Sequence, residues 1–345
     1  MYSEKLEEFR GAVNQSLANA TSPRRDEMAV LATVLWYWRV RELLRPMLGN
    51  SPTPYAIERY LEPEGFGRTQ FNEVFRRRKW DKYAVGLHQP SKTTVSKVEA
   101  MVPGSAGILR HPMWEVLRQP DRVLEKKESW LGRLAPDIQR IVFASESKLS
   151  MRKALTSPDI NEKHLQQLEV RAGFDSVACL AILLAENIYS YDGNNAIHIS
   201  DSLYRALLVS CAFDSYLLMA GHLFQCFRDR LLNQVVVDDM RLDLDTVDFS
   251  ESAFLLCREL WKLMGDSKIG WSREDRARAG ARMLRGKFGF DAMWGLSLLH
   301  VPVAPNSKNF HKATKEYERA RKLHDWGLHN LRNGIVGNIP PHDIW

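Results

Sequence analysis

Helical periodicity is the feature that most limits what this chain can fold into. Apolar residues recur every three to four positions along most of its length, and no long stretch keeps the alternation of a strand. Only residues 235–237 indicate a strand, and weakly. The pattern predicts an all-α protein with helices over residues 3–19, 25–46, 53–61, 69–79, 92–101, 121–134, 136–149, 159–171, 174–188, 200–232, 251–264, 272–285 and 308–332.

One predicted helix, residues 200–232, is apolar on every side. Its apolar residues do not keep to one stripe: Leu203, Leu207, Phe213, Leu217, Met219, Leu223, Phe224 and Leu231. A helix that is hydrophobic all round belongs in the middle of a bundle. We therefore expect a C-terminal α-helical bundle with this buried helix at its centre.

The distribution of proline indicates the domain organisation. Prolines divide the first 120 residues into short elements, whereas none occurs between Pro158 and Pro302, where the predicted helices lengthen. We expect a helical N-terminal domain over residues 1–120, connecting helices over 121–158, and the C-terminal bundle over 159–345.

Composition and cysteine use place the chain among ordinary globular proteins. Hydrophobic residues are 45% and charged residues 26% of the total. Its cysteines lie far apart in apolar helical contexts, which predicts reduced core residues: Cys179, Cys211, Cys226 and Cys257. The charged N-terminal segment is unlike a secretory signal, and no segment has the roughly 20 apolar residues that a spanning helix needs. We expect a cytoplasmic protein with no membrane partner.

The most informative stretch for function is residues 66–104. Six basic and two acidic residues occur between positions 68 and 82, in a chain whose net charge is only +6. Apolar residues at positions 71, 74 and 75 have helical spacing, which predicts a basic helix over 69–79 with Phe75 facing inward. Pro90 marks a loop, and Ser91 is a typical cap for a short helix that buries Val95 and Val98. Helix packing accounts for Trp36, Tyr37 and Trp38.

This order of elements resembles the latter half of Cro-type phage-repressor helix-turn-helix domains. The matching positions, over about 40 residues, are Arg76, Arg77, Trp80, Gly86, Pro90, Ser91, Val95 and Val98. The resemblance implies a basic helix that enters the major groove of operator DNA. The candidate nucleic-acid contacts are Arg68, Arg76, Arg77, Arg78, Lys79 and Lys82. The alternative is that these side chains form a solvated or protein-binding face.

The sequence lacks the common motifs of catalysis and metal binding. It has no H-E-x-x-H, no cysteine pair, no phosphate-cradling loop and no nucleophile elbow. The aspartates at positions 238–248 lack the spacing of a calcium loop, which predicts a solvated linker. We therefore expect no metal and no cofactor, and the sequence favours a protein that is not an enzyme.

One enzymatic alternative remains. Arg319 and His324 form R-x-x-x-x-H, which resembles the ribonuclease motif of the HEPN helical-bundle family. The resemblance implies that the two side chains act together on an RNA phosphodiester, usually across a dimer interface. On one continuous helix, however, five residues place them about 140° apart, which favours a histidine at the edge of the core and an exposed arginine.

These observations support one leading hypothesis and two alternatives. The leading hypothesis is a non-enzymatic, bacterial-type regulatory or adaptor protein that binds DNA or another polyanion through its N-terminal basic segment. The C-terminal bundle would then serve for homo-oligomerisation or contact with a protein partner. The alternatives are a protein–protein scaffold without nucleic-acid contact and a HEPN-like ribonuclease.

Overall fold

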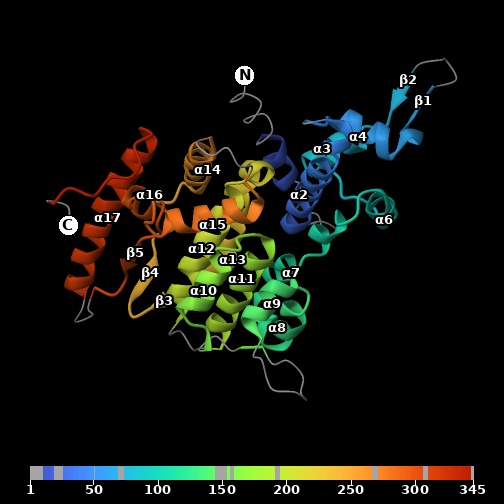
Figure 1. Cartoon of the computed structure of the whole chain (residues 1–345). Helices are drawn as coiled ribbons and strands as arrows, with labels where there is room; N and C mark the ends of the chain where they lie inside the picture. The colour runs from blue at the N-terminus through green and yellow to red at the C-terminus, as the bar shows by residue number, and fades with distance from the viewer. Residues whose placement is uncertain are drawn as a thin grey trace. The chain divides into compact units, whose positions relative to one another are not determined.

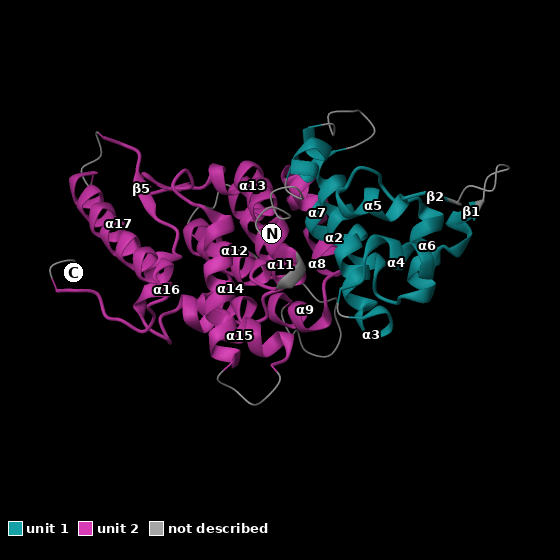
Figure 2. Ribbon diagram, turned by 90° about the horizontal axis from the view of Figure 1, so that it is seen from above, with its two compact units in different colours: residues 1–114 teal, residues 115–345 magenta. Residues whose placement is uncertain are grey.

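The fold is all-α, as the periodicity predicted (Figure 1). The computed structural model describes residues 11–18, 26–49, 51–68, 74–143, 154–155, 159–190, 195–265, 271–305 and 310–342. The chain forms two compact units, residues 1–114 and residues 115–345 (Figure 2). The segment predicted to connect two domains therefore lies within the second unit.

Unit 1 is built from short helices and one β-hairpin. Its elements are α2 (Glu27–Leu43), α3 (Arg45–Leu48), α4 (Pro54–Leu61), η2 (Pro63–Gly65), β1 (Phe66–Arg68), β2 (Val74–Arg76), α5 (Lys79–Ala84), α6 (Lys92–Met101) and η3 (Ala106–Arg110), with α7 (Pro112–Arg118) crossing into unit 2. Ser91 accepts a hydrogen bond from the Thr94 amide at 3.1 Å and caps α6. Val95 and Val98 are buried, so this predicted helix is confirmed.

Helix α2 supplies the core of unit 1. Asp26 caps it by accepting a hydrogen bond from the Ala29 amide at 2.6 Å. Trp36 is fully buried and stacks on Trp80 with 5.3 Å between ring centroids, and Tyr83 packs edge-on against both rings. Burying a large apolar side chain stabilises a fold by about 1.5–3 kcal/mol. The interpretation of the Trp36 cluster as helix packing is therefore correct.

The helix predicted over residues 69–79 is wrong for its described part. β1 and β2 pair antiparallel in this region, with Phe66 opposite Arg76 and Gly67 opposite Phe75. Residues 69–73 lie outside the described residues. Apolar residues three and four positions apart do not separate a helix from a strand in so short a window. The basic segment is consequently a strand, a turn and a short helix.

Unit 2 is a helical bundle around α11 and α12, which pack against each other. Its elements are η4 (Pro120–Arg122), α8 (Val123–Leu131), α9 (Pro136–Val142), α10 (Glu162–Glu169), α11 (Phe174–Tyr189), α12 (Ala196–Cys211), η7 (Asp214–Met219), α13 (Ala220–Arg230), η8 (Leu232–Gln234), β3 (Val236–Val237), β4 (Met240–Leu242), α14 (Phe249–Gly265), α15 (Arg273–Leu284), α16 (Phe290–Gly295), β5 (His300–Pro302) and α17 (Phe310–Arg332). Every residue of α11 from Ser176 to Asn187 is buried. Lys127 on α8 reaches it and donates to Glu186 at 2.7 Å.

The single central helix predicted over 200–232 is also wrong. The chain forms α12, the 3₁₀ segment η7 and α13 instead. The break falls at Ala212 and Phe213, where α12 ends and Phe213 has extended backbone, with φ of −108° and ψ of 119°, before η7 begins. Helix α12 nevertheless lies at the centre of the bundle, where it packs against α10, α11, α14 and α15, and α11 beside it is buried from Ser176 to Asn187.

The aspartate-rich region belongs to a small sheet and is not a solvated linker. β3, β4 and β5 form an antiparallel sheet in that order, so the weak strand signal at 235–237 is confirmed. Asp238 and Asp239 form the tight β3–β4 turn with φ of 50° and 62°, the conformation that such hairpins require. Asp243 is buried and accepts a hydrogen bond from the Tyr317 hydroxyl at 2.7 Å.

The four cysteines form no disulfide and are buried, and burial raises the pKa of the Cys179 and Cys211 thiols. Across the described ranges, no helix combines the length and the apolar character needed to cross a bilayer.

Candidate nucleic-acid interface

The candidate interface is the β1–β2 hairpin of unit 1 with the turn and helix that follow it. Side chains of successive strand residues point to opposite faces. Phe66 and Arg76 therefore share the face that we call inner, and Gly67 and Phe75 share the outer face. The Arg77 amide donates to the Gly65 carbonyl at 3.2 Å, which extends the pairing by one residue.

The inner face is held by a buried carboxylate. Glu58 on α4 is fully buried, and its Oε2 accepts from Nε of Arg76 at 2.6 Å. Its Oε1 accepts from the Lys79 backbone amide at 3.2 Å. Arg76 also pairs with Asp81 at 2.5 Å, and its guanidinium lies over the Tyr55 ring, 5.2 Å from the centroid. Arg76 thus joins the hairpin to α4 and α5.

A second buried carboxylate holds the start of α5. Glu62, the residue directly after α4, accepts hydrogen bonds from Lys79 Nζ at 3.2 Å and from Trp80 Nε1 at 3.1 Å. Trp80 is itself fully buried, so this bond satisfies an indole N–H that would otherwise lack a partner in the core. Arg76 and Lys79 therefore have structural partners within the chain, although both were selected as candidate contacts.

The outer face presents a different set of side chains. The Phe75 ring lies against Gly67, where an added Cβ would come within 2.6 Å of it, and 42% of Phe75 remains exposed. Arg77 and Arg78 are exposed, and Lys82 on α5 is partly exposed. Because Arg77 lies two residues from Phe75 on an extended chain, the ring and the guanidinium share this face.

The turn at Arg78 sets the direction of the chain between β2 and α5. Arg78 has φ of 54° and ψ of 32°, a left-handed conformation that costs about 1–2 kcal/mol for a residue other than glycine.

Of the six candidate residues, the structure brings Arg77, Arg78 and Lys82 to the surface and places Arg76 and Lys79 in ion pairs. The Arg68 side chain lies outside the described residues.

The residues of the R-x-x-x-x-H motif lie on one continuous helix, α17. Arg319 is exposed, whereas the His324 side chain is 14% exposed, and burial lowers the pKa of its imidazole despite Asp325 at 3.5 Å. Five residues of helix turn them about 140° apart. Joint action on one phosphodiester would therefore need a second chain.

The exposed cations of α17 form a stripe of their own. Exposed residues at helical spacing of three and four share one side of it: Lys312, Lys315, Arg319 and Lys322. The basic stretch on α15 differs, because Arg273 lies over the Tyr216 ring and Arg285 pairs with Glu162 at 2.7 Å. Arg273 on α15 and Arg285 just after it thus contribute to packing within unit 2.

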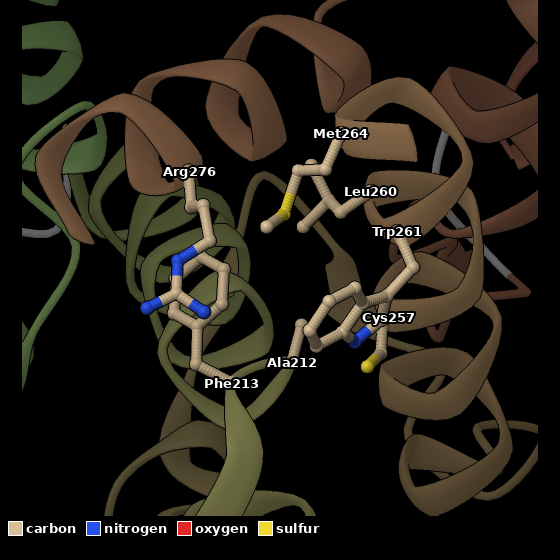
Figure 3. Close-up of a pocket in the computed structure, with 7 residues that line it drawn as sticks. All are labelled: Ala212, Phe213, Cys257, Leu260, Trp261, Met264 and Arg276. Carbon is tan, nitrogen blue, oxygen red and sulfur yellow. The ribbon is translucent and has the colours of Figure 1, made fainter. Parts of the chain in front are cut away.

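An exposed apolar face lies on α14 of unit 2. Phe254 and Trp261 are 52% and 54% exposed and, being seven residues apart, lie on the same side of the helix. A small hollow opens between Trp261, Leu260 and Phe213, and the Arg276 guanidinium lies over the Phe213 ring at 5.1 Å (Figure 3). The hollow has a volume of about 10 Å³, which suffices for no more than one water molecule.

Comparison of the chain with protein-family models, with curated proteins and with solved structures gave no match.

Sequence reasoning missed the residues that organise the interface. Glu58 and Glu62 resemble any other surface glutamate in the sequence, and only the fold shows that both are buried beneath the hairpin. The exposure of Phe75 was missed because a helix was assumed there. A local signal was present, since Gly67 is the residue type that leaves room for a ring on the opposite strand.

Proposed function

We propose that the chain is a non-enzymatic regulatory or adaptor protein that binds nucleic acid through the outer face of the β1–β2 hairpin. The observation that carries this proposal is the exposed Phe75 ring beside the exposed Arg77 on one strand. An aromatic ring stacks on a base of any sequence, and an adjacent guanidinium contacts phosphate. Arg78 and Lys82 extend the positive charge along the chain.

The exposed ring favours a single-stranded ligand. Bases within a duplex are stacked on one another, so that only unpaired bases offer a face to an aromatic side chain. A two-stranded β-ribbon can also enter the major groove of duplex DNA, but there it contacts base edges and the ring has no base face to stack on. Because only an unpaired base can stack on Phe75, we expect the chain to bind single strands more tightly than duplex of the same length.

Reversing the charge of Arg77 and Arg78 together is expected to weaken binding to oligo(dT) by about 10–100-fold. The plot of log affinity against log salt should also become shallower, its slope smaller in magnitude by about 2. The measurement is fluorescence anisotropy of a labelled strand across a salt series. The matched control reverses Lys92 and Lys163, which are exposed and lie outside the hairpin. Equal loss in both double variants, or no binding by the unmodified chain at low salt, would contradict the proposal.

The same titration with Phe75→Leu separates stacking from charge. Leucine keeps the apolar contact with Gly67 but has no aromatic face. Stacking of a base on an aromatic side chain is worth about 1–3 kcal/mol, so the affinity should fall about 5–150-fold while the salt slope stays unchanged. Heparin, a polyanion without bases, should bind the unmodified chain and the Phe75→Leu variant equally.

A protein-interaction scaffold is the second candidate, and the exposed face of α14 favours it. A two-fold contact between two copies needs only one such face, because each chain presents the same patch to the other. We infer that Phe254 and Trp261 would meet their counterparts in a second copy of this chain. Buried tryptophans are frequent energetic centres of interfaces and contribute about 2 kcal/mol or more.

Replacing Trp261 with serine is therefore expected to raise the dimer dissociation constant about 30-fold or more. Sedimentation velocity over a range of protein concentrations measures this. Leu124→Ser is the control, since Leu124 is 61% exposed on α8 and lies outside the α14 face. An unmodified chain that stays monomeric throughout the range would exclude this candidate.

A further inference from the structure

Unit 2 contains a cavity whose lining includes no residue of the hairpin or of α14. It has a volume of about 210 Å³ and lies among α12, α15, α16 and residues 296–298. An apolar cavity of about 150 Å³ is large enough to bind benzene. The cavity of unit 2 therefore has room for a substituted ring.

One wall of the cavity is apolar. Leu284 comes from α15, Met293 from α16, and Leu298 from the segment before β5. A compact apolar ligand group that packs against these side chains would leave water, and each Å² of apolar surface buried would favour binding by about 25 cal/mol. Contact with this wall alone would not distinguish one apolar ligand from another.

Arg205 provides a positive group at the cavity. Its Nε and Nη2 contact the buried carboxylate of Glu169 at 3.0 and 2.9 Å. Arg285 shares this carboxylate and donates to its other oxygen at 2.6 Å. One buried negative charge thus serves two guanidinium groups, and the second partner of Arg285, Glu162, is 57% exposed. Arg205 lines the cavity, and its side chain is 25% exposed.

Trp294 adds a neutral donor. It lines the cavity, and its Nε1 is buried without a hydrogen-bond partner among the described residues. A buried donor without an acceptor costs about 1–3 kcal/mol. Nε1 has almost no exposed surface, so a small rotation of the indole is needed to bring this N–H to a ligand in the cavity. An acceptor atom of the ligand would then recover this cost, and an anionic oxygen would do so most strongly.

The acidic residue of the cavity wall is already paired. Asp201 lies 3.1 Å from Nε2 of His300. Burial alone would lower the pKa of His300, but the hydrogen bond and charge of Asp201 outweigh burial and raise that pKa. The imidazole gives Asp201 a hydrogen-bond partner, so that this carboxylate opposes an incoming anion less than an unpaired one would.

We propose that this cavity binds a small organic anion that joins a carboxylate or phosphate group to a compact apolar body. The anionic oxygens bind Arg205 and Trp294 Nε1, and the apolar body packs against Leu284, Met293 and Leu298. This site does not depend on nucleic-acid binding, because all of its residues belong to unit 2 and its ligand is measured without an oligonucleotide.

Isothermal titration of the full chain with benzoate, phenyl phosphate and benzyl alcohol tests the proposal. We expect one of the two anions to bind at least tenfold more tightly than the alcohol, and their order shows whether the site prefers a carboxylate or a phosphate. Equal binding of all three probes would overturn the assignment of an anion site. No heat with either anion, from a chain that remains folded, would overturn the site itself.

Two variants locate the binding. Leu298→Trp fills the cavity and should abolish binding, whereas Leu124→Trp makes the same change at an exposed position of α8 and should leave binding unchanged. Trp294→Phe keeps an aromatic ring, removes only the N–H, and should weaken anion binding about tenfold without affecting benzyl alcohol. Anion binding that survives both cavity variants unchanged would overturn the proposal.

Discussion

Replacing Glu58 with alanine is expected to lower the free energy of unfolding of unit 1 by about 3–5 kcal/mol. Glu58 is fully buried, and Arg76 is only 18% exposed in its side chain. Removing the carboxylate takes away the buried partner of the Arg76 guanidinium, leaves only Asp81, which is 45% exposed, and deprives the Lys79 amide of its acceptor. The loss is large because the remaining charge stays in a poorly solvated site.

Denaturant unfolding followed by tryptophan fluorescence measures this effect, because Trp36 and Trp80 stack in the core of the same unit. Glu64→Ala is the matched control. Glu64 is 56% exposed and pairs with Lys97, so that its loss should leave the unfolding midpoint nearly unchanged, because exposed ion pairs contribute little to stability. The double change Glu58→Leu with Arg76→Met should recover much of the stability, since it removes both charges. Indistinguishable midpoints for Glu58→Ala and Glu64→Ala would contradict this account.

The features predicted correctly from sequence depend on neighbours along the chain. Ser91 caps α6 through an amide three residues away, and Val95 and Val98 are buried because their spacing places them on one side of that helix. The apolar periodicity identified the all-α class for the same reason. A helix cap and the spacing of apolar residues involve only residues a few positions apart, so a short stretch of sequence contains all the information that predicts them.

The features that were missed depend on residues distant in sequence. The hairpin is fixed by Arg76 meeting Glu58, 18 residues earlier, and β4 pairs with β5 about 60 residues later. Six basic residues in one segment look alike by charge, yet two of them meet buried acids and the exposed ones do not. The candidate site could therefore be placed in the correct segment but not assigned to the correct side chains.

Glycine positions show the same limit. Gly327 lies inside α17, where an isolated helix would gain about 1 kcal/mol from alanine. In the folded chain, an added Cβ at Gly327 would lie 2.5 Å from the Asp291 carbonyl oxygen and 2.6 Å from the Gly295 amide nitrogen. Both obstacles are backbone atoms of α16, which cannot rotate away. The sequence predicts a stabilising substitution, and the structure predicts the opposite.

Gly327→Ala is accordingly expected to destabilise unit 2 by about 3 kcal/mol and to lower its Tm by roughly 6–12 °C. The clash cannot be relieved by shifting α16 alone, because Asp291 on α16 is fully buried and accepts hydrogen bonds from Asn330, Gly337 and Asn338 at 2.7–2.8 Å. Separating the two helices would break these bonds as well.

Thermal unfolding followed by far-UV circular dichroism measures the change. Gly265→Ala is the control, because Gly265 ends α14 with open space where a Cβ would be added, and this variant should keep or slightly raise the Tm. A Tm for Gly327→Ala at or above that of the unmodified chain would show that α16 and α17 do not approach through their glycine backbones. A fall confined to Gly327→Ala assigns the loss to this contact, since the substitution is otherwise favourable to a helix.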